Sequence, residues 1–416
     1  MRFLTRNSPE TSVPDPQAPE VAVLPAAHRD LPVTARQRAR VATMALFFIA
    51  GMMYASWGVH VPTVRDRFHL NAALLSFALL AVAGGSIGAM VTNGSWIARV
   101  GTRRACLTGG LAMAACAALI LVVPAYWMLL IVLAIFGAGM ATLDVAMNAE
   151  ASAVEKALGR PIMSALHGMF SLGGMFGAAV GGALLSRGMA PALHLALAAA
   201  VSALVLLLAC PSVLPHVPHA EHPDAATPRA SRWRSGALWA LGTMALVALI
   251  AEGAMYDWAT VYMRDVVLAT PALASAAYAA FSGGMAAARF AGDAVRARFG
   301  APQLVMISAT LACAGMVDAL LLPNPIAALA GFALIGLGLA NMMPVLFAAA
   351  ASVKGIHAAE GLAHVAGLAY FGLLLGPVII GAVTQMTNLT IGLSVVAICS
   401  AAIALAGPKV LRRLNV

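Results

Sequence analysis

A repeat of about half the chain length most constrains what this sequence can fold into. Five short groups recur 199 residues later without a gap: Arg65-Asp66 as Arg264-Asp265, Leu74 and Ser76 as Leu273 and Ser275, Gly84-Gly85 as Gly283-Gly284, Arg99-x-Gly101 as Arg298-x-Gly300, and Gly137-x-Gly139 as Gly336-x-Gly338. The chain is also 62% hydrophobic. A gapless repeat in an apolar chain predicts two homologous membrane bundles in one polypeptide. Parallel repeats of this kind place a binding site near the bilayer midplane, between the halves.

The composition excludes an ordinary soluble domain. The mean hydropathy is +0.90 and only 10% of the residues are charged, whereas a soluble domain has about 25% charged residues. The lipid bilayer is therefore the expected surrounding of most of the chain. A net charge of +9 could indicate nucleic-acid binding. The cations, however, lie in short loops and tails, where positive-inside bias places them, so we expect no nucleic-acid partner.

Apolar segments of the ~20 residues needed to cross a bilayer recur along the whole chain. We predict twelve spans, at 40–61, 73–95, 104–124, 127–149, 163–186, 191–210, 236–263, 271–294, 302–322, 326–350, 361–384 and 388–407. The expected fold is an all-α membrane protein with twelve transmembrane helices in two parallel-repeat six-helix bundles.

The remaining segments define the expected domain organisation. Residues 1–36 hold six prolines and no periodic apolar pattern, which is typical of a disordered tail. The expected units are a tail at 1–36, an N-terminal bundle at 37–210, a linker at 211–235, a C-terminal bundle at 236–407 and a second tail at 408–416. If both termini are cytoplasmic, the outward loops contain only Arg65, Arg67, Arg187 and Arg264 of the 25 lysines and arginines. That asymmetry predicts this orientation for a multi-pass protein.

The loop between the second and third spans carries a motif of glycines and arginines. It reads Gly94-Ser-Trp-Ile-Ala-Arg99-Val-Gly101-Thr-Arg103-Arg104, and a looser copy in the second half contains Asp293, Arg298 and Gly300. The motif resembles the cytoplasmic-loop signature of the major facilitator superfamily, Gly-x-x-x-Asp-Arg-x-Gly-Arg-Arg. The resemblance implies the superfamily's twelve-helix fold over about residues 40–407, and a conformational latch in these loops.

The first loop departs from that signature at one position. Ala98 stands where the signature has its aspartate, so the first-half latch lacks a carboxylate and Asp293 is the candidate to supply one. The alternative is that the arginines only enforce topology. The Arg-Asp pairs beyond the first and seventh spans are expected to be exposed and to contribute little energy. Their repetition is explained by the duplication alone.

Further segments resemble a narrower branch of the superfamily, the YbjJ/MosC-like (rhizopine-transport-protein-like) proteins of the bacterial inner membrane. The matching segments are Tyr54-Ala-Ser-Trp57, Leu143-Asp144-Val-Ala-Met-Asn148, His167-Gly168-Met-Phe-Ser-Leu-Gly173-Gly174 and Glu252-Gly253-Ala-Met-Tyr-Asp257-Trp258. The resemblance implies an inner (cytoplasmic) membrane location and leaves the solute open.

Acidic side chains inside the predicted spans are the main candidates for chemistry, because an ionisable group in a membrane is costly. Asp144 lies in the fourth span, and Glu252 and Asp257 lie in the seventh. The family resemblance implies that spans 1, 4, 7 and 10 line the central cavity. Asn148 shares a helix face with Asp144, and a carboxylate beside an amide can bind a hydroxyl or an amine. Desolvation favours the protonated form of a carboxyl group, which suits proton coupling. The alternative is a permanently protonated acid bonded to a neighbouring helix.

Four other side chains complete the candidate site. Tyr54 and Trp57 in the first span could stack on a sugar-like ring, or anchor the helix at the outer interface. Asn341 follows Gly336 and Gly338 and precedes Pro344 in the tenth span, where glycine and proline loosen a helix. The alternative for the two glycines is plain helix packing. His167 opens the fifth span and has a counterpart, His364, near the repeat offset. A proton relay and a plain interfacial position are both open for this pair.

These features predict a transporter and no enzyme. The sequence has no phosphate-binding loop of the Gly-x-x-x-x-Gly-Lys-Ser/Thr type and no Cys/His metal spacing, so we expect no cofactor and no metal. The predicted function is secondary active transport of a small polar organic solute (sugar, polyol or amino-polyol), coupled to protons, by alternating access. A proton-antiport exporter of drugs or metabolites is the first alternative, and a non-transporting membrane receptor is the second. We expect a monomer.

Overall fold

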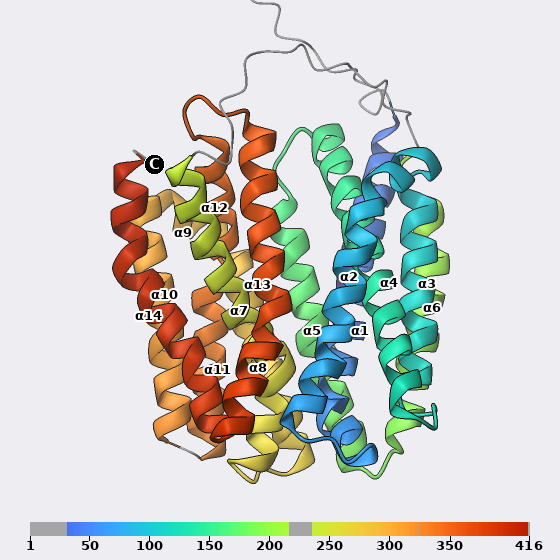
Figure 1. The fold of residues 1–416 in the computed structure, drawn as a ribbon. Coiled ribbons are helices and arrows are strands. Elements are labelled where there is room, and N and C mark those ends of the chain that lie inside the picture. The colour runs from blue at the N-terminus through green and yellow to red at the C-terminus, as the bar shows by residue number, and fades with distance from the viewer. Residues whose placement is uncertain (1–30, 216–234, 323, 415–416) are drawn as a thin grey trace, which may run out of the picture.

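The protein is a bundle of long helices that lie roughly parallel to one axis (Figure 1). The computed structural model describes residues 31–215, 235–322 and 324–414, and in these residues it has no strand. The helices of the first half are α1 (Val33–Arg67), α2 (Ala72–Val100), α3 (Thr102–Leu119), α4 (Tyr126–Leu158), α5 (Met163–Ser186), α6 (Pro191–Ala209) and the short 3₁₀ helix η1 (Cys210–Ser212). Those of the second half are α7 (Gly236–Asp265), α8 (Pro271–Phe290), α9 (Gly292–Arg298), α10 (Ala301–Leu321), α11 (Pro325–Leu339), α12 (Met342–Ala351), α13 (Ala358–Met386) and α14 (Leu389–Arg413).

These helices make twelve spans, as the sequence predicted. α8 with α9 forms the eighth span and α11 with α12 forms the tenth. In the described residues, ten helical segments are long and apolar enough to cross a membrane by length and composition. The other two spans are the third, α3, which has two arginines in its first turn, and the eighth, in which α8 is rich in alanine and glycine. The two six-helix halves stand side by side in Figure 1, the first from blue to green and the second from yellow to red.

The helices extend past the apolar segments from which the spans were predicted. α1 begins at Val33, inside the expected tail at 1–36, and α14 continues to Arg413, inside the expected tail at 408–416. A helix can continue beyond the hydrocarbon layer because its backbone bonds are internal, whereas hydropathy marks only the buried length. The rest of the first tail and most of the linker at 211–235 lie outside the described residues.

The sequence repeat corresponds to repeated helix crossings. A Cβ atom added to Gly85 of α2 would lie 1.9 Å from the Ala134 carbonyl oxygen of α4, and one added to Gly137 would lie 1.9 Å from the Val82 carbonyl oxygen. The second half repeats both contacts at the same offset, with 2.2 Å between Gly284 and the Ala333 oxygen and 2.0 Å between Gly336 and the Phe281 oxygen. Small residues let membrane helices approach this closely. The repeated glycines therefore fix the same packing in each half.

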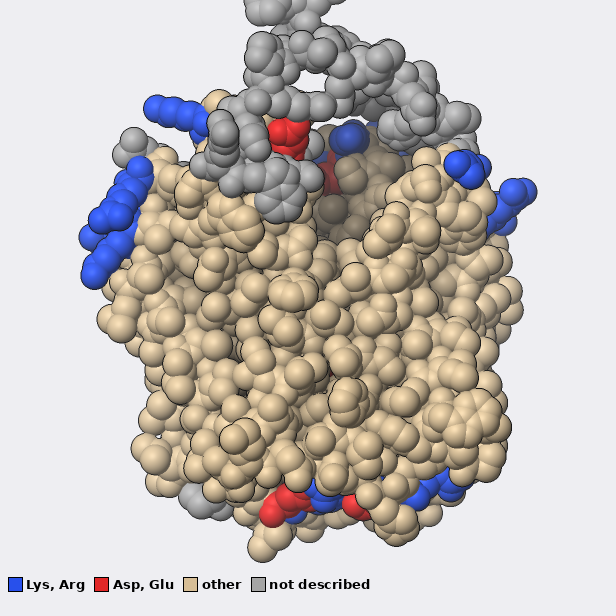
Figure 2. Space-filling view, in the orientation of Figure 1, with Lys and Arg blue, Asp and Glu red and all other residues tan. Residues whose placement is uncertain are grey.

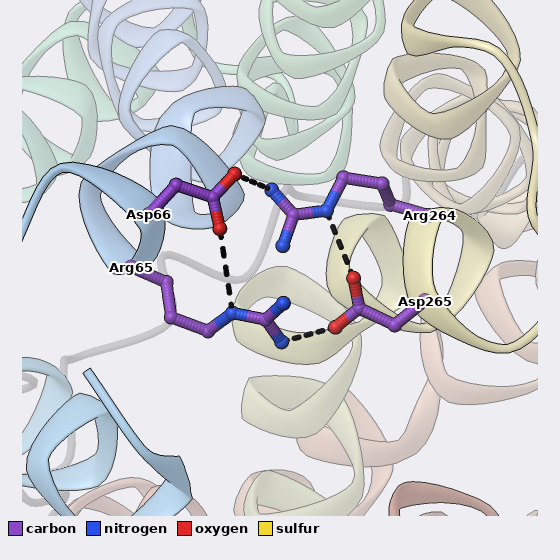
Figure 3. A network of polar contacts seen from close by, with 4 residues as sticks. All are labelled: Arg65, Asp66, Arg264 and Asp265. Atoms are coloured by element: carbon purple, nitrogen blue, oxygen red, sulfur yellow. Dashed lines mark hydrogen bonds and ion pairs between the residues drawn. The ribbon is translucent and has the colours of Figure 1, made fainter. Parts of the chain in front are cut away.

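Four charged residues join the two halves at one end of the bundle (Figure 3). This end, here called the far end, lies opposite the start of α1 and the end of α14, which mark the terminus-bearing end (Figure 1). Arg65 at the end of α1 pairs with Asp265 of α7, and Arg264 lies 2.6 Å from Asp66. Within the halves, Arg264 lies 2.9 Å from Asp265 and Arg65 lies 3.8 Å from Asp66. These four residues, the far-end quartet, correct the expectation that the repeated pairs only record the duplication. Each arginine bonds the aspartate of the other half.

Candidate functional site

A cavity of about 580 Å³ lies between the two halves. Its lining comes from both halves, and it extends to the ends of α4 and α9 at the terminus-bearing end of the bundle. Figure 2 shows the surface hollowed at this end, with charged side chains inside the hollow. The polar residues of the lining are Tyr54, Ser86, Asp144, Glu155, Ser164, His167, Glu252, Tyr256, Asp257, Arg289, Arg296, Asn341 and Tyr370.

The α4 side of the cavity presents Asp144. The Asn148 amide, one turn along α4, donates hydrogen bonds to the Asp144 carboxylate at 3.1 Å and to its backbone carbonyl at 2.9 Å. The shared face that the spacing predicted is therefore present, but Asn148 is not part of the lining. It orients the carboxylate, whereas Asp144 itself borders the cavity. Tyr370 of α13 borders the same cavity from the other half.

The α7 side presents a carboxylate that is balanced by a cation. Glu252 lies 3.7 Å from the Arg289 guanidinium of α8. The Tyr256 hydroxyl, one turn along α7, lies 3.4 Å from the same carboxylate. The predicted spans 1, 4, 7 and 10 themselves contain no lysine or arginine at a comparable depth. The structure brings one from the eighth span, because Arg289 reaches inward from the end of α8.

Asp257 lies deeper on α7, toward the far end. Asp257 is 8% exposed and borders the cavity. In the part of the chain that the structure describes, no hydrogen bond or ion pair reaches its carboxylate. Tyr54 of α1 also borders the cavity, with its ring edge-on to Tyr256 at a centroid distance of 5.6 Å. Asp257 and Tyr54 thus line one cavity from different halves.

Trp57 does not lie at the cavity, although the sequence placed it beside Tyr54. It is 1% exposed and packs near Phe136 of α4, with ring centroids 6.4 Å apart. Trp57 follows Tyr54 by three positions, which is less than one full helical turn, so the two side chains leave α1 in different directions and meet different helices. Farther along α1, His60 bonds His194 of α6 at 2.8 Å, inside the first half.

Asn341 stands at a break in the tenth span. Two residues, Ala340 and Asn341, interrupt the helix between α11 and α12. Pro344 follows and cannot donate the helical bond to Ala340, because proline has no backbone N–H. Ala340, Asn341 and Pro344 all border the cavity. The loosening predicted for this span is present as an interrupted helix near Pro344, whereas Gly336 and Gly338 lie within α11 and pack closely against α8 and α10.

The two histidines that stand near the repeat offset occupy different surroundings. His167 borders the cavity, its backbone carbonyl lies 3.3 Å from the Arg289 guanidinium, and its ring lies edge-on to Phe47. His364 on α13 packs edge-on against Trp239, with centroids 5.0 Å apart. The repeat offset therefore does not give this pair matching positions at the cavity.

The loop motif lies at the terminus-bearing end, outside the cavity lining. Gly101, with φ of 86°, separates α2 from α3, a conformation that favours glycine. Gly94, by contrast, lies inside α2. The arginines of the loop motif, Arg99, Arg103 and Arg104, are exposed. Arg298 of the second copy, two residues before Gly300, is exposed as well. No ion pair in the described residues involves these four arginines, and the side chain of Asp293 lies outside the described residues.

A carboxylate near the first loop comes from a residue that the sequence did not single out. Glu150 of α4 is buried and accepts hydrogen bonds from the Thr102 hydroxyl at 3.0 Å and the Leu214 amide at 2.8 Å. It ties the start of α3 to the segment that follows α6. Glu150 lies one residue beyond the fourth predicted span, so burial in the membrane gave no signal for it. Tyr370 and Arg289 do lie inside predicted spans, where a polar group is a signal.

The cavity between two repeated membrane bundles defines a secondary transporter and not an enzyme. The family model of the Major Facilitator Superfamily matches residues 1–149 and 43–379. The chain belongs to the major facilitator superfamily.

Known proteins agree with this assignment. An uncharacterised MFS-type transporter of Yersinia pestis is 34% identical over 376 residues, which cover 90% of this chain and 96% of that protein. Membrane protein MosC of Rhizobium meliloti is 33% identical over 343 residues, covering 82% and 83%. A crystal structure of a variant of the nucleoside transporter NupG superposes with a TM-score of 0.69 at 13% identity, covering 90% of this chain and 99% of that one. At that identity the likeness concerns the fold.

Proposed function

We propose that this protein moves a small polar organic solute (a sugar, polyol or amino-polyol) across the membrane by proton-coupled alternating access. The observation that carries the proposal is the cavity between the halves, which contains carboxylates from both of them. Asp144 belongs to the first half, and Glu252 and Asp257 belong to the second. A solute held between them contacts both halves at once, so its binding can favour one arrangement of the halves over another.

The geometry of the two ends supports alternating access. The cavity extends to the terminus-bearing end, whereas the far-end quartet joins α1 to α7 at the opposite end. This arrangement corresponds to a state open on one side. Breaking the quartet while the terminus-bearing end closes would give the opposite state, with the cavity between the halves in both.

The charges of the lining favour a neutral or cationic solute over an anion. Arg289 balances Glu252, and Arg296 lies in the lining with Glu155. Asp144 and Asp257 have no lysine or arginine partner in the described residues. Two carboxylates without cations can accept hydrogen bonds from hydroxyl or ammonium groups, and they can take up protons. Of the two, Asp144 is the proposed coupling residue, because Asn148 orients it from a position outside the lining.

A proteoliposome assay tests this proposal. Purified protein is supplied with a matched panel of glucose, glucosamine, glucuronate, inositol and a dicarboxylate, with and without a pH gradient. We expect gradient-stimulated uptake of neutral or amino compounds, and its loss in Asp144→Asn. Asp318→Asn is the matched control, since Asp318 lies in α10 outside the lining. Gradient-driven uptake that survives Asp144→Asn would refute the coupling assignment, and tight binding of the dicarboxylate would refute the solute class.

Proton-antiport export of apolar compounds is a second candidate, and the apolar part of the cavity lining favours it. Methionines border the cavity from both halves, among them Met90, Met140 and Met343. Flexible thioether side chains adapt to ligands of different shape. Efflux of a hydrophobic cation such as ethidium, with no uptake of any sugar or polyol in the same vesicles, would favour this candidate.

The proposed setting is the inner membrane of a bacterium, with the protein a monomer and both termini in the cytoplasm. The asymmetry of the charged loops supports this orientation, which makes the terminus-bearing end cytoplasmic and the far end periplasmic. In this orientation, residues 1–36, 211–235 and 408–416 are cytoplasmic. Protease protection of the far-end loops in right-side-out and inverted vesicles tests it.

A further inference from the structure

The contact between α5 and α8 joins the two halves along its length. A Cβ atom added to Gly182 of α5 would lie 2.7 Å from the Ser275 side chain of α8, and one added to Gly174 would lie 3.0 Å from Ser282. Nearer the terminus-bearing end, a Cβ atom on Gly168 would lie 2.7 Å from the Phe290 ring. We call this contact the α5–α8 seam. It stays closed at the end where the cavity opens.

Arg289 lies where this seam meets the cavity. Its guanidinium donates hydrogen bonds to the Ser171 hydroxyl at 2.6 Å and to the His167 carbonyl at 3.3 Å, both on α5 of the other half. The Ser164 hydroxyl of α5 in turn donates to the Arg289 backbone carbonyl at 2.6 Å. The same guanidinium lies 3.7 Å from Glu252 of α7. One side chain therefore connects a cavity carboxylate to a helix of the opposite half.

The two terminal nitrogen atoms of the Arg289 guanidinium make different contacts. Nη1 makes both bonds to α5, whereas Nη2 faces Glu252 at a distance longer than a hydrogen bond. Glu252 thus has its charge balanced without having its oxygen atoms fully occupied. A proton or the ammonium group of an amino solute that reaches Glu252 neutralises the charge that holds Nη2 toward α7. The guanidinium is a rigid fork, so its two nitrogens move together. When Nη2 is no longer attracted to Glu252, the hydrogen bonds that Nη1 makes with α5 are therefore disturbed as well.

We infer that Arg289 is a positioning residue for transport: it faces the Glu252 carboxylate in the empty cavity and transmits the loss of that negative charge on loading to the α5–α8 seam. The inference rests on the proposed function, since it presumes that Glu252 is reached by solute or protons. It goes beyond that function in naming the side chain by which occupancy of the cavity changes the contact between the halves.

Hydrogen–deuterium exchange of the full-length protein in nanodiscs tests the inference without any solute. The variant Glu252→Gln imitates the loaded, uncharged carboxyl group. We expect it to raise exchange in α5 peptides around residues 163–175 by about two- to fivefold, the range of a partly exposed ion pair. In an Arg289→Gln background, adding Glu252→Gln should produce no further change, because the connection is already broken.

Three further variants separate this role from a merely structural one. Arg289→Lys keeps the charge, but its single ammonium group cannot hold Glu252 and α5 together, so Glu252→Gln should have no effect in that background. Arg296→Gln and Asp257→Asn are matched controls in the same cavity, which should leave α5 exchange at the wild-type level. An increase that persists in Arg289→Gln, or no increase with Glu252→Gln, would overturn the inference.

The outcomes also separate this inference from the proposed function. Uptake in proteoliposomes with no response of α5 to Glu252→Gln would leave the transport proposal standing and reject the role of Arg289. A response of α5 in a protein that moves no solute under any gradient would support the connection and reject the transport proposal.

Discussion

The far-end quartet allows a quantitative test of how the closed end is held. Three of its side chains, those of Arg65, Arg264 and Asp265, are 29%, 25% and 23% exposed, whereas that of Asp66 is 64% exposed. Partly exposed ion pairs contribute about 0.2–1 kcal/mol each. The two pairs that cross between the halves therefore favour the closed far end by about 0.4–2 kcal/mol, which is about a 2- to 30-fold ratio of closed to open molecules.

Charge reversal is the perturbation that tests this estimate. Asp265→Arg removes one of the two crossing pairs and sets a cation opposite Arg65. Loss of the attraction and gain of a similar repulsion should disfavour the closed far end by about 0.4–2 kcal/mol. Reversing all four charges, with Arg65→Asp, Asp66→Arg, Arg264→Asp and Asp265→Arg, restores every attraction with opposite sign and should restore the closed end. The single and quadruple variants thus separate electrostatics from a loss of packing.

The assay is a distance measurement across the far end. Spin labels at the exposed positions Val122 and Leu268, in a background whose five native cysteines are replaced, report closure by double electron–electron resonance. Arg67→Asp is the matched control, because Arg67 lies at the same helix end and bonds Val123 of its own half. The reasoning fails if Asp265→Arg changes the distances no more than Arg67→Asp, or if the quadruple variant does not recover the wild-type distances. The effect should also shrink in 1 M salt, since screening weakens exposed pairs.

Four further expectations follow from the packing and the cavity. Gly85→Ala should lower the melting temperature and the yield of folded protein, because its Cβ would meet the α4 backbone, whereas Gly84→Ala, whose Cβ would meet nothing within 4 Å, should leave both unchanged; equal effects would contradict the packing. Asp144→Asn should abolish the dependence of uptake on a pH gradient while exchange of internal for external solute continues, measured in proteoliposomes. Tyr370→Phe removes a hydroxyl from the cavity and should weaken solute affinity about tenfold or less, as expected for one hydrogen bond, measured by calorimetry. Pro344→Ala restores a backbone donor at the helix break and should slow transport more than it weakens binding, so unchanged turnover would show that the break is not used.

The sequence predicted the helical scaffold of this protein because local and repeated sequence patterns determine that scaffold. Apolar length set the twelve spans, and one offset of 199 residues predicted two equivalent halves. The contacts of Gly85 and Gly284 match because a helix crossing depends on a small residue at a fixed place, which a gapless repeat preserves. The shared face of Asp144 and Asn148 was predictable for a similar reason, since residues four apart on a helix are neighbours.

Contacts between distant segments were decided by the tertiary structure. Helical periodicity places side chains around one helix axis, but it does not state which helix stands opposite. For this reason Trp57 faces Phe136 instead of the cavity, and the carboxylate near the first loop comes from Glu150. The pairing of Glu252 with Arg289 likewise depends on how α7 and α8 pack.

The repeated Arg-Asp pairs show most clearly which features the sequence determined and which the tertiary structure decided. By itself the sequence determined that Arg65-Asp66 and Arg264-Asp265 occupy equivalent positions at the ends of equivalent helices. Only the packing of α1 against α7 decided that each arginine bonds the aspartate of the other half. The physical reason is that duplication fixes the structure of each half, whereas the polar contacts between the halves depend on how the two copies are placed against each other.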